Sequence, residues 1–310
     1  MYQSHYGLRE LPFELTSDPR FLYFTAPHRE ALSNLEYGLS AAKAVTALIG
    51  EAGTGKTTLL RAALESERCA HVKCVYLHNP ALTRTEFLEM LARQFQLSAR
   101  AAGSKTILLD ELEVVLRQHR DRGETAALVV DEAQSLSRDV LEEIRLLANI
   151  ETPLAKLLPL VLAGQPELAN RLNEPALRQL KQRVALRCAL RPFTLPETAA
   201  YIATRIRIAG GTAARLFTRE AVALVHERSG GIPRTINVIC DNALLGGMAA
   251  ERQPCDRAMV LEVCRDFDLQ SVGRERESPA SELAEVDAVE RDAGYRQTQD
   301  TGQMAAGRSR

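Results

Sequence analysis

A glycine-rich stretch that contains one lysine and two neighbouring threonines specifies chemistry most directly in this sequence. Its residues are, in order, Gly50, Glu51, Ala52, Gly53, Thr54, Gly55, Lys56, Thr57 and Thr58. They fit the pattern G-x-x-x-x-G-K-[ST], the Walker A loop that binds the phosphates of nucleoside triphosphates. Glycines let the backbone wrap closely around a polyphosphate, with its N–H groups pointing inward. The stretch therefore predicts a triphosphate site, and all of these residues are candidate nucleotide ligands.

Two side chains of the loop have predicted roles of their own. Lys56 supplies positive charge to the β- and γ-phosphate oxygens, and the Thr57 hydroxyl is placed to bind Mg²⁺. Residues 45–49 predict a short buried strand and residues 57–64 a helix, so the motif has the required order of strand, loop and helix. A chance glycine-rich turn, which is the alternative interpretation, does not explain this order.

A second motif is formed by two carboxylates that follow an apolar run. Residues 126–130 are all apolar, and Asp131 and Glu132 come directly after them, as in a Walker B motif. Such a run is typical of a central parallel strand buried on both faces. We expect Asp131 to hold the Mg²⁺ shell and Glu132 to polarise the attacking water as a general base. Acidic residues also end ordinary strands, but the Walker A loop upstream favours the catalytic interpretation.

A further apolar strand, predicted over residues 157–165, ends in the amide of Gln165. Ligands bind at the carboxyl ends of the strands in such sheets. Gln165 is therefore a candidate to position the attacking water or to sense the γ-phosphate. The alternative is that its side chain caps the strand end.

A run of cations follows in the sequence. It consists of Arg171, Arg178, Lys181, Arg183, Arg187 and Arg191. The usual interpretation of such a run is a solvated helix face. The sharper hypothesis is that Arg178 or Arg183, with Arg183 preferred, reaches across a subunit interface as an arginine finger and stabilises transition-state charge on a neighbour's γ-phosphate.

The next part of the chain is predicted to be helical throughout. Thr194 and Glu197 have the T-x-x-E spacing of a capping box and begin the first helix. Three further helices are predicted over residues 219–228, 235–248 and 256–267, without a strand pattern between them.

Arg234 opens one of these helices, directly after a sharp Gly-Gly-Ile-Pro turn. A cation is electrostatically unfavourable at a helix N-terminus. This favours a functional role, in which Arg234 folds back over the bound nucleotide as a second sensor. The alternative is an exposed arginine at the start of a helix.

The composition is that of an ordinary soluble globular protein. The chain has 310 residues, of which 45% are hydrophobic and 25% charged, and its formal net charge is −1. No overall basic excess indicates nucleic-acid binding, although a local basic patch remains compatible with these numbers. No apolar stretch approaches the ~20 residues that a membrane helix needs, and the N-terminus lacks a signal-peptide pattern. We expect a cytoplasmic protein without a membrane span, with peripheral attachment to the inner membrane left open.

These patterns predict an α/β fold in which a parallel sheet flanked by helices carries the Walker loop and a smaller all-helical domain follows. The predicted parts are an N-terminal arm (1–27), a P-loop domain (28–191), a helical lid (192–268) and a disordered tail (269–310). The tail is predicted to be disordered because it has too little apolar surface to offset its ordering entropy. The aromatic residues of the arm either pack against the nucleotide base or attach the arm to the core.

Several short stretches together resemble the ExeA-like AAA+ ATPases, also called the general secretion pathway protein A type. They are residues 6–8, 12–13, 18–23, 28–32, 50–57, 131–134, 164–168 and 230–234. The resemblance covers about residues 1–268. The Walker A loop is generic to many nucleoside triphosphatases, whereas the arm and the Gly-Gln-Pro-Glu-Leu stretch are more specific.

The resemblance implies a AAA+ fold with a helical lid and with nucleotide bound at the subunit junctions of a homo-oligomeric ring. It implies that Lys56 and Thr57 bind ATP and Mg²⁺, that Asp131 and Glu132 complete hydrolysis, and that Arg234 is the second sensor. Secretion members of the family commonly continue into a membrane span and a peptidoglycan-binding domain. This sequence has neither, so we expect any envelope role to depend on a partner protein.

Three functions compete at this point. The first is an ATPase that drives a bacterial envelope export system, which serves secretion, pili or exopolysaccharide. The second is a DNA-binding AAA+ ATPase resembling transposition regulators, in which the cationic run of residues 171–191 tracks phosphates. The third, a scaffold that binds nucleotide without hydrolysing it, is disfavoured by the presence of Glu132.

Overall fold

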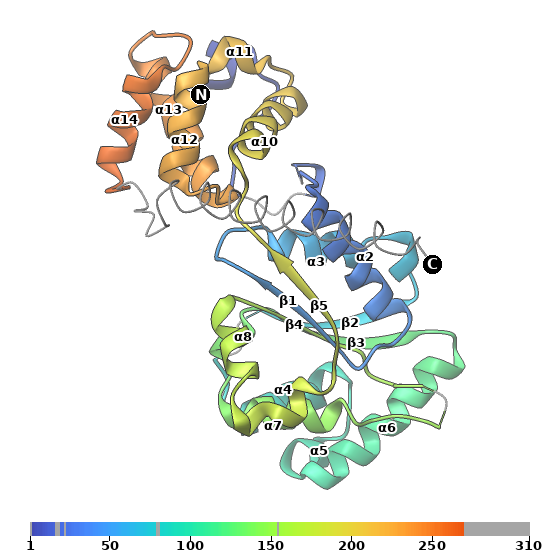
Figure 1. Ribbon diagram of the computed structural model, residues 1–310. Coiled ribbons are helices and arrows are strands. Elements are labelled where there is room, and N and C mark those ends of the chain that lie inside the picture. The colour runs from blue at the N-terminus through green and yellow to red at the C-terminus, as the bar shows by residue number, and fades with distance from the viewer. Residues whose placement is uncertain (1, 16–18, 22, 79–80, 154, 270–310) are drawn as a thin grey trace, which may run out of the picture. The chain divides into compact units, whose positions relative to one another are not determined.

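The apolar runs of the sequence form the strands of one parallel sheet (Figure 1). The computed structural model describes residues 2–15, 19–21, 23–78, 81–153 and 155–269. The strands are β1 (Val45–Gly50), β2 (Val72–Leu77), β3 (Thr125–Val130), β4 (Leu160–Gly164) and β5 (Val184–Leu190), in the order β2-β3-β4-β1-β5. All neighbouring pairs are parallel. The carboxyl ends of β1, β3 and β4, which carry the predicted motifs, therefore meet at one edge of the sheet.

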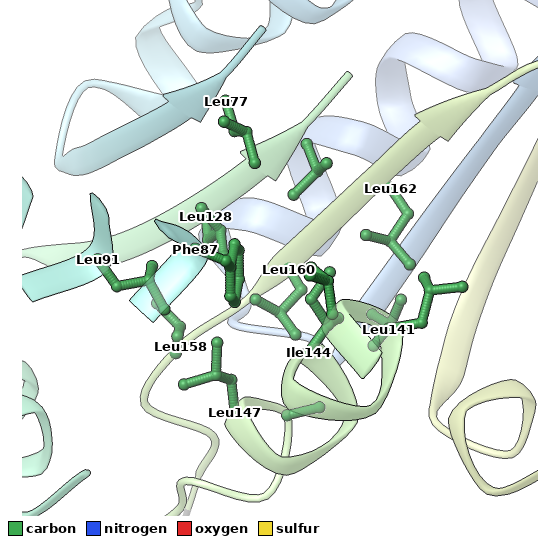
Figure 2. Packing of buried hydrophobic residues seen from close by; sticks show 14 of the residues in the cluster. Leu77, Phe87, Leu91, Leu128, Leu141, Ile144, Leu147, Leu158, Leu160 and Leu162 are labelled. Carbon is green, nitrogen blue, oxygen red and sulfur yellow. The ribbon is translucent and has the colours of Figure 1, made fainter. Parts of the chain in front are cut away.

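Both faces of the central strands are buried. Along β3, Leu128 and Val130 belong to the core on one face, and Ala127 and Val129 to the core on the other. The first core lies under α4 (Arg84–Gln94), α6 (Lys105–Asp121), α7 (Arg138–Leu147) and α8 (Pro166–Leu172). Figure 2 shows Phe87 and Ile144 of this core near Leu128 and Leu160. The second core lies under α2 (Ala26–Ser40) and α3 (Lys56–Leu64). The prediction of a central strand from an uninterrupted apolar run is confirmed.

Most elements predicted in the first half of the chain are present with small changes at their ends. The helix α4 begins after Thr83, which caps it through a capping box with Glu86. Three helices of this half were not predicted, namely α1 (Tyr2–Tyr6), α5 (Ala99–Gly103) and α7. Short 3-10 turns lie at Pro19–Phe21 (η1), Glu67–Cys69 (η2), Ala133–Ser135 (η3) and Pro175–Leu177 (η4).

The interpretation of residues 171–191 as one helix face is wrong for the C-terminal half of this run. After α8 and the short α9 (Arg178–Lys181), the chain forms β5, which pairs with β1 at the edge of the sheet. In β5, Cys188 and Leu190 are buried against α2, whereas Arg187 is exposed. An edge strand with one covered face alternates in this way, and its arginines obscure the strand pattern in the sequence.

The helical domain predicted after the sheet is present. It consists of α10 (Leu195–Ile208), α11 (Ala213–Leu216), α12 (Arg219–Ser229), α13 (Pro233–Ala249) and α14 (Arg257–Asp266), of which α11 was not predicted. The capping box is confirmed, because the Thr194 side chain accepts a hydrogen bond from the Glu197 N–H, and the Glu197 carboxylate accepts one from the Thr194 N–H at 2.8 Å. None of the helices among the described residues has the length and apolar character to cross a membrane.

The N-terminal arm packs against the helical domain. It begins with α1 (Tyr2–Tyr6), whose two tyrosines are buried in the same apolar cluster as Phe13 and the helices α10 to α14. The Tyr6 hydroxyl donates to the carbonyl of Leu244 in α13 at 3.1 Å. For these three aromatics, the interpretation that they attach the arm to the body of the protein holds. The predicted tail lies, apart from Leu269, outside the described residues.

Candidate nucleotide site

The Walker A loop connects β1 to α3, and its shape requires glycine. Gly53 and Gly55 have φ angles of +80° and +95°, which side chains rarely adopt. A β-carbon added to Gly53 would lie 2.6 Å from the β-carbon of Arg234, and one added to Gly50 would lie 2.7 Å from the Thr54 hydroxyl oxygen. The loop therefore has the close backbone packing that the sequence predicted for it.

Lys56 places an ammonium group at this loop. The residue is only 4% exposed, and its Nζ donates to the carbonyl oxygens of Gly50 at 2.8 Å and Glu51 at 3.1 Å. Burial lowers the pKa of Lys56, while the nearby carboxylates of Glu132 and Asp131 act in the opposite direction. Within the described residues, no ion pair occupies the Lys56 charge, which leaves it available to an anionic ligand.

Thr57 and Asp131 meet at the first turn of α3. The Thr57 hydroxyl donates to Asp131 Oδ2 at 2.6 Å, and the Tyr76 hydroxyl donates to the same oxygen at 3.1 Å. A hydroxyl and a carboxylate are the oxygen ligands that Mg²⁺ takes beside phosphates and water. The pair thus fits a magnesium site, and Tyr76 orients its carboxylate. Tyr76 was not assigned from the sequence, because one aromatic in a strand is usually a core residue.

Glu132 follows at the end of β3 with a left-handed backbone, at φ 51° and ψ 37°. Its Oε2 accepts hydrogen bonds from Gln134 Nε2 at 2.6 Å and from Gln165 Nε2 at 3.3 Å. Burial acts to raise the pKa of Glu132, but these two hydrogen bonds and the Lys56 charge outweigh it and hold the pKa below its usual value. Glu132 is therefore a carboxylate at neutral pH. The structure brings the predicted Gln165 to it, and adds Gln134.

A cleft of about 260 Å³ opens beside the Walker A loop and extends toward the arm and the helical domain. Its lining includes Gly53 to Thr58 of the loop, Glu132, Pro233 and Arg234, together with Leu15, Phe21, Tyr23, His28, Phe193, Tyr201, Arg205 and Asn237. The aromatic rings there are close together, with centroids 5.8 Å apart for Tyr23 and Phe193 and 5.2 Å for Phe193 and Tyr201. The cleft thus joins a polar end at the Walker A loop to an aromatic end formed by these rings.

His28 links the start of α2 to the Walker A loop. It is 2% exposed, with Nδ1 2.7 Å from the Thr25 hydroxyl and Nε2 3.3 Å from the Thr54 carbonyl oxygen. Burial lowers the pKa of His28. The neutral ring satisfies both contacts when Nε2 carries the proton, donates it to Thr54 and leaves Nδ1 to accept from Thr25.

Arg234 and the two candidate arginine fingers lie in different places. Arg234 lines the cleft, and its backbone N–H donates to the Gly53 carbonyl at 3.2 Å. Arg178 is exposed on α9, and Arg183 is half-buried before β5, with an Nε that has no hydrogen-bond partner among the described residues. Neither finger candidate lines this cleft. Their action on a neighbouring subunit stays a prediction.

Arg205 joins the arm to the helical domain at the aromatic end of the cleft. It is 5% exposed, and its guanidinium donates to the carbonyls of Pro12 and Glu14 and to the Tyr201 hydroxyl. Its Cζ also lies 4.7 Å from the centre of the Phe21 ring. Arg205 could not be recognised from the sequence, because an arginine in a helix normally faces solvent.

Replacing Arg205 with Ala should therefore destabilise the folded protein. The change leaves buried carbonyls without a donor, and we expect it to lower the free energy of unfolding by about 2–4 kcal/mol. Urea denaturation measures this difference. Arg207→Ala on the exposed face of the same helix is the control, and we expect it to change stability by less than about 0.5 kcal/mol. Equal stability of the two variants would contradict the role of Arg205 as a link.

The fold and the site together define the class of P-loop AAA+ proteins. Walker A lies after β1, Walker B after β3, a polar residue after β4 and a helical domain after β5.

A family model described as an AAA domain matches residues 40–172. Over 249 residues the chain is 41% identical to general secretion pathway protein A of Aeromonas hydrophila, and the match covers 80% of this chain and 45% of that protein. The resemblance to the ExeA-like AAA+ ATPases is confirmed, and the chain spans less than half the length of this relative.

Solved structures share the fold at low sequence identity. Cdc6p from Pyrobaculum aerophilum has a TM-score of 0.60 and 20% identity, over 81% of this chain and 70% of that chain. The Drosophila ORC bound to DNA has a TM-score of 0.62 and 18% identity, over 84% of this chain and 64% of that chain. The ORC2 protein of Aeropyrum pernix, in ADPNP–ADP complexes, has a TM-score of 0.54 and 18% identity, over 77% and 65%. At these identities the likeness concerns the fold alone.

Proposed function

We propose that this chain is a Mg²⁺-dependent ATPase whose hydrolysis drives assembly or regulation of a bacterial envelope export system. The observation that carries the enzymatic part is the position of Glu132, which lies in the same cleft as Lys56 and Thr57 and is ionised at neutral pH. The relative named general secretion pathway protein A supports the link to export. We place the protein in the cytoplasm, peripheral to the inner membrane, where a partner protein of the export system recruits it.

In this proposal, different residues of the site bind the phosphates, hold the metal ion and accept the proton. The backbone N–H groups of the Walker A loop and the Lys56 ammonium bind the phosphates, and the aromatic end of the cleft packs against the adenine. Thr57 and Asp131 would hold Mg²⁺, which when bound would neutralise charge on the phosphate oxygens. Glu132 accepts the proton of the attacking water, and Gln165 helps to orient the carboxylate. Arg234 contacts the phosphates from the start of α13.

An arginine finger from a neighbouring subunit would make ATP hydrolysis depend on the association of subunits. Because Arg178 and Arg183 lie outside the cleft of their own chain, a finger must act on a neighbouring subunit in a ring. We expect the specific activity of ATP hydrolysis to rise with protein concentration, and Arg183→Ala to abolish this rise. Arg219→Ala, which changes an exposed arginine of the helical domain, is the control. Specific activity that is constant over a wide concentration range would contradict a shared site.

A DNA-binding ATPase of the transposition-regulator type is the second candidate. The exposed cations Arg178, Lys181 and Arg187 favour it, because they lie close together in sequence around the start of β5. Duplex DNA added to the turnover assay at low salt separates the two functions. Stimulation by DNA, with an affinity that falls steeply as salt rises, would put this candidate first. Turnover that does not respond to DNA would leave the export function as the proposal.

A further inference from the structure

The turn η3 after β3 contains a glutamine whose side-chain amide is bonded at both ends. Gln134 Nε2 donates to Glu132 Oε2 at 2.6 Å, and Gln134 Oε1 accepts the backbone N–H of Gln165 at 3.1 Å. The amide thus bridges the carboxyl ends of β3 and β4, the two strands that carry the predicted base and the predicted sensor.

The orientation of this amide is determined by its partners. A backbone N–H can only donate, so the Gln134 atom that faces Gln165 must be the oxygen. The nitrogen is then the atom that faces Glu132, where a carboxylate can only accept. Reversing the amide would place donor against donor and acceptor against acceptor, so the bridge has one orientation.

The position of the glutamine is fixed from two further sides. Arg171 of α8 donates from the same nitrogen to the carbonyls of Gln134 and Leu136, at 2.6 Å each. A β-carbon at position 164 would lie 2.7 Å from Gln134 Oε1 and 2.8 Å from a methyl carbon of Leu168, so Gly164 makes the room that the amide needs. This network also supports the left-handed backbone of Glu132, which is a strained conformation for a residue with a β-carbon.

We propose that Gln134 is a positioning residue that fixes the general base Glu132 for attack on the γ-phosphate. Gln134 and Gln165 both donate to Oε2, which holds the carboxylate in one rotamer and leaves Oε1 as the acceptor for the proton of the attacking water. The proposal rests on the proposed function, because it takes Glu132 as the base. Gln134 is not part of the cleft lining, so in this proposal it acts through Glu132 alone.

The proposal predicts a change in kcat without a comparable change in KM. In Gln134→Leu the side chain keeps a similar volume but donates nothing to Glu132. We expect kcat to fall about 10- to 100-fold and KM for ATP to stay within about twofold, since part of a general-base contribution is lost while the phosphate contacts remain. Steady-state ATP turnover measures both constants. Ser135→Ala, which changes the exposed neighbour in the same turn, is the matched control and should leave kcat unchanged.

The split between kcat and KM, taken with the melting temperature, separates positioning of a base from general support of the loop. A residue that merely supports the loop would lower the melting temperature and raise KM along with the fall in kcat. Gln134→Glu also removes the donor to Glu132, and we expect it to lower kcat at least as much as Gln134→Leu does, again with KM within about twofold.

Two results would overturn the proposal. If both Gln134 variants bound nucleotide and showed wild-type kcat, while Glu132→Gln lacked turnover, the positioning role would be wrong and the base assignment would stand. Normal turnover in Glu132→Gln would remove the base itself, and the role of Gln134 would fall with it. Gln134→Glu keeps the test decisive if Gln134→Leu does not fold, because it preserves the size and polarity of the side chain.

Discussion

Glu132→Gln is expected to bind ATP as tightly as the wild type and to reduce turnover by about two to four orders of magnitude. The amide has the shape of the carboxylate, and its oxygen still accepts from Gln134 and Gln165, so the cleft keeps its form. Thr57 and Asp131 are not changed, and they keep the magnesium site. An amide cannot take the proton of the attacking water, so the chemical step alone is lost. Equilibrium binding of ATP and single-turnover hydrolysis measure the two effects separately.

The matched control for this variant is Glu65→Gln. Glu65 is an exposed carboxylate at the C-terminal end of α3, and the same chemical change there should affect neither binding nor turnover. Normal turnover in Glu132→Gln would mean that another group is the base. Loss of binding would mean instead that Glu132 supports the Walker A loop, through the Lys56 charge that it faces.

The Walker motifs and the central strands could be predicted because their signals are local. A phosphate-binding loop needs glycines, a lysine and a hydroxyl within one short stretch, and β3 needs an apolar run that ends in carboxylates. Parallel pairing then brings the strand ends together, which is why Asp131, Glu132 and Gln165 meet as expected. The capping box at Thr194 is local in the same sense, and it too is present.

Features that depend on packing between distant segments could not be predicted. Arg205, Tyr201 and Asn237 line the cleft only because the arm and the helices enclose it, and their neighbours in sequence carry no sign of this. The strand β5 was missed because only one of its faces is covered and arginines interrupt its apolar pattern. The aromatic residues of the arm were predicted either to attach the arm to the core or to pack against the nucleotide base. Tyr2, Tyr6 and Phe13 join the core of the helical domain, whereas Phe21 and Tyr23 line the cleft.

Gln134 belongs to a motif that is visible in the sequence, but its structural role could not be predicted from that motif. It follows Asp131 and Glu132 in a motif, where it could equally be a solvent-facing turn residue. Its role depends on the N–H of Gln165, which lies 31 positions further along the chain, and on the space left by Gly164. Its role as a donor to the half-buried Glu132 carboxylate therefore depends on contacts that form only when the chain folds.

Lys56→Ala is expected to abolish measurable hydrolysis and to weaken ATP binding by about 100-fold, which corresponds to ~3 kcal/mol. The ammonium is the positive charge of the Walker A loop in a site where burial strengthens its interaction with phosphate oxygens. The change also leaves the carbonyls of Gly50 and Glu51 without the donor that holds them, so the loop loses part of its shape. Fluorescent-nucleotide titration and steady-state turnover measure the two effects.

Lys73→Ala, at an exposed lysine of β2, is the control for the loss of one positive charge, and it should leave binding and turnover unchanged. Unchanged turnover in Lys56→Ala would mean that the nucleotide is bound elsewhere. If binding were lost but inorganic tripolyphosphate still bound normally, the contribution of Lys56 would be to the shape of the cleft rather than to phosphate charge. Loss of both ligands in Lys56→Ala, with both retained in Glu132→Gln, would divide the site as its geometry indicates, with Lys56 responsible for phosphate binding and Glu132 for the chemical step.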